Sequence, residues 1–185
     1  MILEIVNYGT PVLREKGAPV RKVDDKIRQL AIDMLETMED AHGVGLAAQQ
    51  VGVALQMCVI NVAGIEDRPS TMEIDGKPVD PDAHMPLVLL NPELELGAER
   101  ESGSEGCLSF PDITADVLHA ARVIVRARNL EGAEVRFSAT GLLARALQHE
   151  VDHLHGILFV DRMSSAKRFS LGTRLKRLQR ETTGA

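Results

Sequence analysis

Residues 148–156 read Gln-His-Glu-Val-Asp-His-Leu-His-Gly, and they place His149 and His153 four residues apart. On an α-helix, this spacing puts the two side chains about 40° apart on one face and one turn apart along the axis. Two imidazoles so placed can bind one metal ion, and Glu150 between them can reach a water on that ion without being a ligand. A pair of hydrogen-bonded core histidines is the alternative, but the adjacent glutamate favours a hydrolytic metal site.

A catalytic site of this kind normally has three protein ligands, with water in the fourth position. Downstream, position 159 is Phe, where one class of metallopeptidases carries a third histidine, and the only later glutamate is Glu181, in a basic tail. The third ligand must therefore lie upstream. Residues 101–111 place Cys107 in a glycine-flanked segment without a regular pattern. A thiolate with two imidazoles leaves one position open for water, so we expect Cys107 to complete the site.

The length and composition of the chain predict one globular domain, because 185 residues with 44% hydrophobic residues can bury a sizeable core. Aromatic residues make up only 3%, so aliphatic side chains and methionines must fill that core. The charge is unevenly spread, since the chain carries −6 overall while residues 166–181 hold six Lys/Arg against one Glu. We therefore expect a catalytic domain over residues 1–165 and a basic C-terminal helix and tail over 166–185.

The cellular setting expected from the sequence is the cytoplasm. Glu4 interrupts the N-terminal apolar run, and no stretch approaches the ~18 apolar residues of a membrane span. Two cysteines are too few for a disulfide framework. Cys58 lies in the apolar run 54–62, where a small hydrophobic core residue is the simplest interpretation.

The order of the predicted elements indicates an α+β domain, with antiparallel β-sheets packed around the central helix that carries His-Glu-x-x-His and with a C-terminal helix. Thr10 and Pro11 predict a short first helix to about residue 16. A longer helix is predicted from Asp24 or Asp25 to about residue 41. Thr140 is expected to cap the motif helix, and Ser164 or Ser165 the last one.

The predicted strands are apolar or alternating segments, namely residues 54–62, 87–90, 93–100, 117–118, 123–128 and 134–139. Residues 64–86 hold four of the eight prolines and an Asp-Gly pair, which predicts a loop or a short exposed hairpin. Residues 43–52 are rich in glycine and alanine and fit no regular element, and without a following Lys-Ser/Thr they are no phosphate loop.

Three segments together resemble a known family. They are residues 43–50 (Gly-Val-Gly-Leu-Ala-Ala-Gln-Gln), 105–109 (Glu-Gly-Cys-Leu-Ser) and 148–153 (Gln-His-Glu-Val-Asp-His). Their types and order are similar to the three motifs of the peptide deformylases, which remove the N-terminal formyl group from nascent bacterial proteins. Residues 8–14 also resemble the family's N-terminus, so the resemblance covers nearly the whole chain.

The resemblance implies one ferrous ion per chain, held by Cys107, His149 and His153, for which Zn²⁺, Ni²⁺ or Co²⁺ can substitute. The ligand set alone would also suit zinc, which binds more tightly than iron in most sites. Glu150 would take a proton from the metal-bound water and later deliver it to the leaving amine.

The resemblance also implies the groups that contact the substrate. The Gln50 side chain and the Leu108 backbone N–H would stabilise the oxyanion. The formyl-methionyl peptide would form backbone hydrogen bonds along Val44, Gly45 and Gly106. Its methionine side chain would enter an apolar pocket lined by Leu142 and Ala146 together with Val44.

Two positions depart from the family pattern. Many bacterial relatives carry arginines seven and twelve residues after the cysteine, where this chain has Thr114 and His119. The first change is expected to weaken the grip on the distal substrate backbone, and the second to alter a partner of Asp152. The segment 64–86 is longer than in compact relatives.

The partners implied are a formyl-methionyl nascent peptide and the ribosome near its exit tunnel, in a bacterial cytoplasm, with the chain acting as a monomer. Basic residues of the last helix would dock on RNA phosphate. A solvated cationic face is the alternative. Two other functions compete, an endopeptidase of the His-Glu-x-x-His type and a non-catalytic, metal-bound paralogue that binds N-termini. The missing downstream ligand argues against the first, and intact Glu150 and Gln50 argue against the second.

Overall fold

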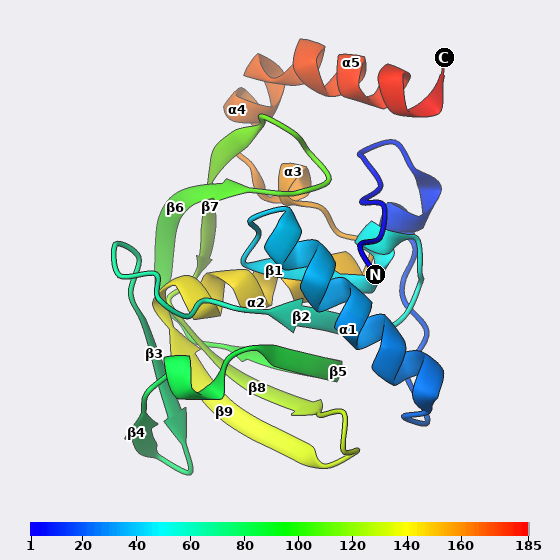
Figure 1. Cartoon of the computed structure of the whole chain (residues 1–185). Coiled ribbons are helices and arrows are strands. Elements are labelled where there is room, and N and C mark those ends of the chain that lie inside the picture. The colour runs from blue at the N-terminus through cyan, green and yellow to red at the C-terminus, as the bar shows by residue number, and fades with distance from the viewer. Residues whose placement is uncertain (185) are drawn as a thin grey trace.

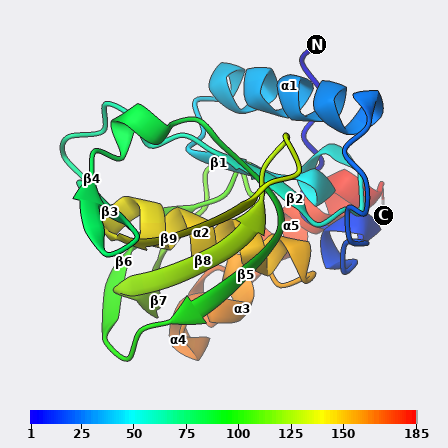
Figure 2. The same cartoon turned by 90° about the horizontal axis from the view of Figure 1, so that it is seen from below.

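Helix α2, Gly141–Leu154, lies between two antiparallel β-sheets in the computed structural model, which describes residues 1–184 (Figure 1). The last residue of the predicted tail, 185, lies outside this range. The larger sheet has the strand order β1-β2-β5-β8-β9-β3-β4, and the smaller one pairs β6 with β7. Figure 2 shows β5, β8 and β9 in front of α2, so the larger sheet covers one side of this helix.

The predicted fold class is confirmed, and most of its elements lie where the sequence pattern placed them. The strands are β1 Gly45–Ala47, β2 Met57–Ile60, β3 Ser70–Ile74, β4 Lys77–Val79, β5 Leu87–Leu96, β6 Arg100–Gly106, β7 Thr114–Ala120, β8 Arg122–Arg128 and β9 Glu134–Thr140. The helices are α1 Asp25–Asp40, α2, α3 Phe159–Arg162, α4 Ser165–Ser170 and α5 Gly172–Thr183, with 3₁₀ turns at Pro11–Arg14, Ala48–Val51 and Asp82–His84. Within residues 1–184, no helix is both long and apolar enough to span a membrane.

Helix α2 begins at a close contact between segments that are far apart in sequence. Thr140 occupies the predicted cap position, but its Oγ1 lies 2.5 Å from that of Thr71 and makes no capping hydrogen bond. Ser70 supplies the cap instead, because its Oγ accepts from the Leu143 N–H at 2.9 Å. Gly141 has φ +67°, and a Cβ there would lie 2.0 Å from the Pro69 carbonyl oxygen. Only glycine therefore fits at this junction.

The core is mainly aliphatic, as the composition predicted. One cluster joins α2 to the larger sheet through residues such as Leu143 and Val125. A second, under α1, contains Met34, Met38 and Met57. Helix α1 starts where predicted, because the Asp24 side chain accepts from the Ile27 N–H. The fully buried Cys58 belongs to the first cluster, and burial raises the pKa of its thiol.

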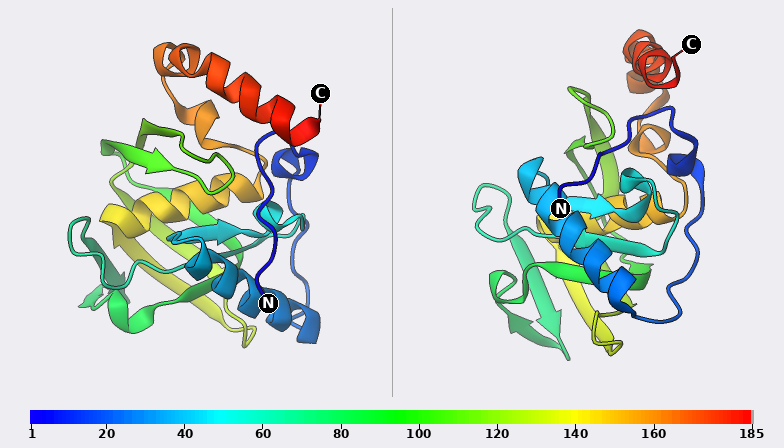
Figure 3. Two further views of the ribbon diagram at one scale, coloured as in Figure 1. Left: turned by 45° about the horizontal axis from the view of Figure 1, so that its top comes forward. Right: turned by 45° about the vertical axis from the view of Figure 1, so that its right-hand side comes forward.

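A third cluster fastens the C-terminal segment to the body. Leu171 and Leu175 are buried beside Leu13 and Phe110, and the Phe110 ring stacks on Tyr8 with 4.7 Å between centroids. Figure 3 shows the C-terminal end of α5 beside the N-terminal segment. The predicted single last helix is in fact two helices, α4 and α5, which break at Leu171.

Three further predictions of local structure were wrong. The segment around residues 101–106 was expected to be irregular but forms strand β6. Its Ser/Gly-rich sequence lacks apolar alternation, and pairing with β7 keeps it extended. Residues 87–96 form one strand rather than two, with a register shift between Leu90 and Glu93. Residues 43–52 contain the short buried strand β1 and a 3₁₀ turn. The segment 64–86 does contain a hairpin, β3–β4, and β3 extends the larger sheet by pairing with β9.

Candidate active site

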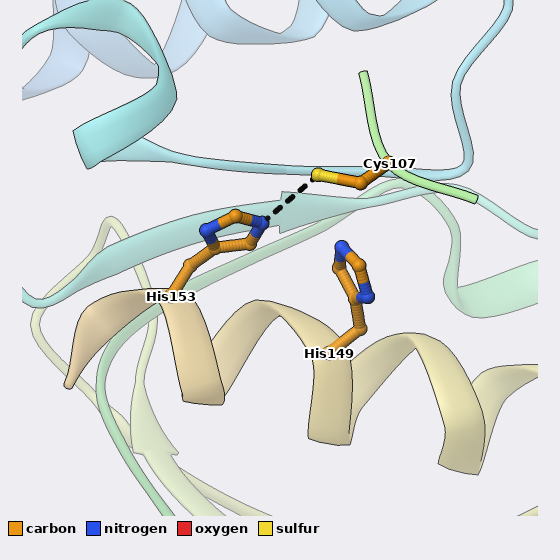
Figure 4. Close-up of side chains that lie close together, drawn as sticks. All are labelled: Cys107, His149 and His153. Carbon is orange, nitrogen blue, oxygen red and sulfur yellow. Dashed lines mark hydrogen bonds between the residues drawn. The ribbon is translucent and has the colours of Figure 1, made fainter. Parts of the chain in front are cut away.

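Three side chains of types that can bind a metal converge beside the C-terminal half of α2 (Figure 4). Cys107 directly follows β6, whereas His149 and His153 stand one turn apart on α2. One ligand atom from each of the three lies within 4.8 Å of the others, and the Cys107 Sγ is 3.3 Å from the His153 Nε2. Within residues 1–184, this is the one group of three such residues close enough to hold an ion.

The donor set fits a catalytic divalent cation. A thiolate with two imidazoles provides three ligands and leaves a position for water. Burial lowers the pKa of His153 well below its ordinary value, which keeps the imidazole neutral and able to offer a lone pair. Burial also lowers the pKa of His149, but its contacts with Cys107 and Glu105 outweigh burial and raise it.

Glu105 orients His149, a role that the sequence analysis did not assign. Its carboxylate is 2.5 Å from the His149 Nδ1, which leaves the Nε2 of that ring free for an ion. The same carboxylate lies 2.9 Å from the His119 Nε2 and 3.2 Å from the Arg145 Nη1. Burial raises the pKa of Glu105, but the two histidines outweigh burial and lower it. Glu105 is thus a buried, ionised carboxylate that contacts His149 and lines the same cleft.

His119, expected to alter a partner of Asp152, forms no hydrogen bond or ion pair with Asp152 within residues 1–184. Asp152 pairs instead with Arg162, at 2.8 and 2.9 Å, and Arg162 belongs to the helix α3 that the sequence pattern did not reveal. His119 points to Glu105 from β7, where it is 5% exposed. This histidine therefore acts on the site through Glu105, which in turn holds His149.

Glu150 lies at the floor of the site and is 3% exposed. Burial raises its pKa to about 7, although the nearby His149 opposes this shift. Its Oε2 is buried without a hydrogen-bond partner in the described part of the chain, which costs about 1–3 kcal/mol unless a bound group satisfies it. A Cβ on Gly45 would lie 2.3 Å from the other oxygen, Oε1. The glycine at this position leaves room for the carboxylate.

The side-chain amide of Gln50 is held in one orientation. Its oxygen accepts from the Ala47 N–H at 2.9 Å, and its nitrogen lies 3.2 Å from the Ser109 Oγ and 3.5 Å from the Cys107 Sγ. The amide N–H₂ group therefore points toward the candidate metal ligands.

A cleft of about 480 Å³ opens beside these residues. The predicted site residues that line it are Val44, Gly45, Gln50, Gly106, Cys107, Leu108, Leu142, Ala146, His149 and Glu150. His153 is not among the lining residues and lies deeper, 1% exposed. A larger hollow of about 670 Å³ lies between the β3–β4 hairpin and the β8–β9 turn, and none of the predicted site residues line it.

A Cys-His-His set beside a buried glutamate, on the central helix of an antiparallel α+β fold, is the arrangement of a metal-dependent hydrolase. Residues 2–169 match the sequence model of a protein family described as polypeptide deformylase. The chain belongs to this family of metal-dependent enzymes, which remove N-formyl groups from nascent peptides.

Individual relatives agree with this assignment. The chain is 46% identical over 180 residues to a peptide deformylase of Methylacidiphilum infernorum, covering 97% of this chain and 94% of that protein. The crystal structure of peptide deformylase from Thermotoga maritima matches with a TM-score of 0.76 at 36% identity, covering 89% and 99% of the two chains. That from Legionella pneumophila matches with a TM-score of 0.81 at 34% identity, covering 99% and 98%.

Replacing Glu105 with glutamine should lower metal affinity about 10–100-fold, because the group that fixes the His149 ring loses its charge. The measurement is competition with a chromogenic chelator. The matched control is Glu101→Gln on the same strand, since the Glu101 side chain is exposed and forms no ion pair within residues 1–184. Equal affinities for the two variants would show that the Glu105 contact does not position the ligand.

Proposed function

We propose that Cys107, His149 and His153 hold one divalent cation, and that Glu150 acts as the general base and acid of deformylation. The observation that carries this proposal is the convergence of the three ligand atoms beside a buried carboxylate with an unpartnered oxygen. When bound, the cation would supply Lewis acidity toward the formyl carbonyl and toward water.

Glu150 takes a proton from the attacking water at its Oε2 and delivers it to the amine that leaves. Its pKa near 7 suits both transfers, because a group that titrates near the working pH can accept and release a proton. Burial keeps bulk water from competing for the carboxylate. The carboxylate remains beside the ligands without joining them, since it projects from the helix between the two histidines.

The Gln50 amide and the Leu108 backbone N–H stabilise the negative charge that develops on the formyl oxygen. The fixed orientation of the Gln50 amide supports this role, because a donor held in place beforehand needs no reorganisation during the reaction. Ala47 and Ser109 hold the two ends of that amide.

The formylated peptide binds between the outer edges of strands β1 and β6. Strand β1 is the last strand of the larger sheet, and β6 pairs only with β7 among the described strands. An extended peptide can add to these edges along Val44, Gly45 and Gly106, which line the cleft. Two apolar residues of α2 in the same cleft, Leu142 and Ala146, receive the methionine side chain together with Val44.

The native ion in this proposal is Fe²⁺, with Zn²⁺, Ni²⁺ or Co²⁺ able to replace it. The family resemblance supports iron, whereas the donor chemistry alone accommodates any of the four ions. The test is anaerobic purification with metal analysis, followed by a formate-release assay on formyl-Met-Ala-Ser. The expected result is about one iron per chain and formate from this peptide only, with the unformylated peptide as the control. A chain that releases no formate with any of the four ions would contradict the proposal.

We further propose that the chain works as a monomer in a bacterial cytoplasm and docks on the ribosome through the basic segment 166–185. Six exposed cations support this interpretation, namely Lys167, Arg168, Arg174, Lys176, Arg177 and Arg180. The segment is fastened to the catalytic part by Leu171 and Leu175, so its deletion would expose core surface. Charge reversal therefore tests docking better than truncation.

Changing Lys176, Arg177 and Arg180 together to Glu should weaken ribosome co-sedimentation at low salt and leave deformylation of short peptides unchanged. Arg174 is spared because its guanidinium contacts the Asp112 carbonyl and helps to seat α5. The physical reason is lost counterion release, so the defect should be largest at low salt.

The matched control reverses three exposed cations of the larger sheet, Lys77, Arg126 and Arg128, which gives the same change in net charge at another surface. Equal co-sedimentation of the two triple variants would dispose of docking through α5.

A further inference from the structure

Arg68 reaches the cleft from the segment between β2 and β3, whose main chain is tied to the start of α2. Ser70 caps that helix through Leu143, and Pro69 packs on Gly141 at a distance that tolerates no side chain. These contacts fix the segment to the helix that carries the His-Glu-x-x-His motif. The position of Arg68 relative to the site is therefore built into the fold.

The guanidinium of Arg68 meets strand β6 at one wall of the cleft. Its Nη2 donates to the Ser104 carbonyl oxygen at 3.1 Å, and both residues line the cleft together with Gly106. Ser104 and Gly106 are two residues apart on β6, which corresponds to about 7 Å along a strand, with their carbonyls on the same side. Moving from Gly106 to Ser104 leads away from Cys107. Arg68 thus contacts the strand edge on the side distal to the candidate ligands.

Most of the donors of Arg68 remain available. A guanidinium has five N–H groups, and the bond to Ser104 uses one of them. The side chain is exposed and makes no other hydrogen bond or ion pair within residues 1–184. Arg145, the other arginine that lines the cleft, is engaged by Glu105. Arg68 is therefore the cation with free donors at this wall.

We propose that Arg68 is a specificity-determining residue that binds the third residue of the formylated peptide and favours an acidic side chain there. This inference rests on the proposed path of the substrate along Gly106. A peptide whose first residue pairs near Gly106 advances about 7 Å in two residues, which brings its third residue to Arg68. Carboxylates suit the planar fork of a guanidinium, because both N–H groups can bind the two oxygens.

The test compares formyl-Met-Ala-Asp-amide, formyl-Met-Ala-Lys-amide and formyl-Met-Ala-amide. Wild type should prefer the aspartate peptide to the lysine peptide. Arg68→Ala should raise KM for the aspartate peptide on the order of tenfold with kcat nearly unchanged, because it removes one charge-assisted contact. The dipeptide should stay within about twofold, since it ends before Arg68. Arg68→Lys should keep part of the aspartate preference, because the charge remains and the fork is lost.

The matched control is Arg126→Ala, which removes an exposed arginine of β8 that does not line the cleft. A second readout is calorimetric binding of the product Met-Ala-Asp-amide, which needs no turnover. If Arg68→Ala binds this product more weakly than wild type and Arg126→Ala does not, the inference is supported even when the formate-release assay shows no deformylation. Two results would overturn the inference. Arg68→Ala could keep the wild-type ratio of kcat/KM between the aspartate and lysine peptides, or it could lose as much kcat/KM with the dipeptide as with the aspartate peptide. Either result would mean that Arg68 only supports β6.

Discussion

Glu150→Gln should keep the bound ion and lose formate release by about 10²–10⁴-fold, the range that general acid–base catalysis contributes. Glutamine has nearly the same shape as glutamate, so it can occupy the space that Gly45 leaves open. It cannot take up the proton of the attacking water. The ligands are untouched, because Cys107, His149 and His153 keep their own contacts.

Two measurements separate this outcome from a structural defect. Metal content should equal that of wild type, and kcat should fall while KM for formyl-Met-Ala-Ser changes little. The control is Glu101→Gln, which makes the same chemical change at an exposed position of β6. Activity of Glu150→Gln within a few-fold of wild type would exclude Glu150 as the base.

The sequence predicted that Cys107, His149 and His153 lie close together, and local spacing accounts for the two histidines. His149 and His153 are separated by one helical turn, so any regular helix brings them together. Cys107 is 42 residues from His149, and its position could be predicted only because no other suitable ligand was available. The fold class followed from the alternation of strands between helices. Hydrophobic periodicity likewise located α1 close to its observed bounds.

The sequence failed where tertiary contacts outweigh local pattern. Strand β6 has mostly exposed polar residues and is held by backbone pairing with β7, which no periodicity reveals. Glu105 acquires its role because folding places it against His149 and His119. Arg68 looked like part of a surface loop, and only the contact of its neighbours with α2 directs it into the cleft.

Cys107→Ala should lose the ion altogether and with it essentially all turnover. Two imidazoles remain, and they are one ligand short of the three that a stable catalytic site normally has. The loss of a thiolate also removes the only anionic ligand, so the positive charge of the ion is no longer compensated. The Glu105 carboxylate cannot replace it, because that group is already held by His149, His119 and Arg145.

Cys58→Ala provides the matched control for this substitution. Cys58 is fully buried in the core beneath the site, and burial raises the pKa of its thiol, so it is not a ligand but a small apolar side chain. Its replacement should lower the melting temperature and leave metal content and kcat unchanged, whereas Cys107→Ala should lose both the metal and turnover. Metal analysis after dialysis decides between them. One tightly bound equivalent in Cys107→Ala would mean that the third ligand is another residue.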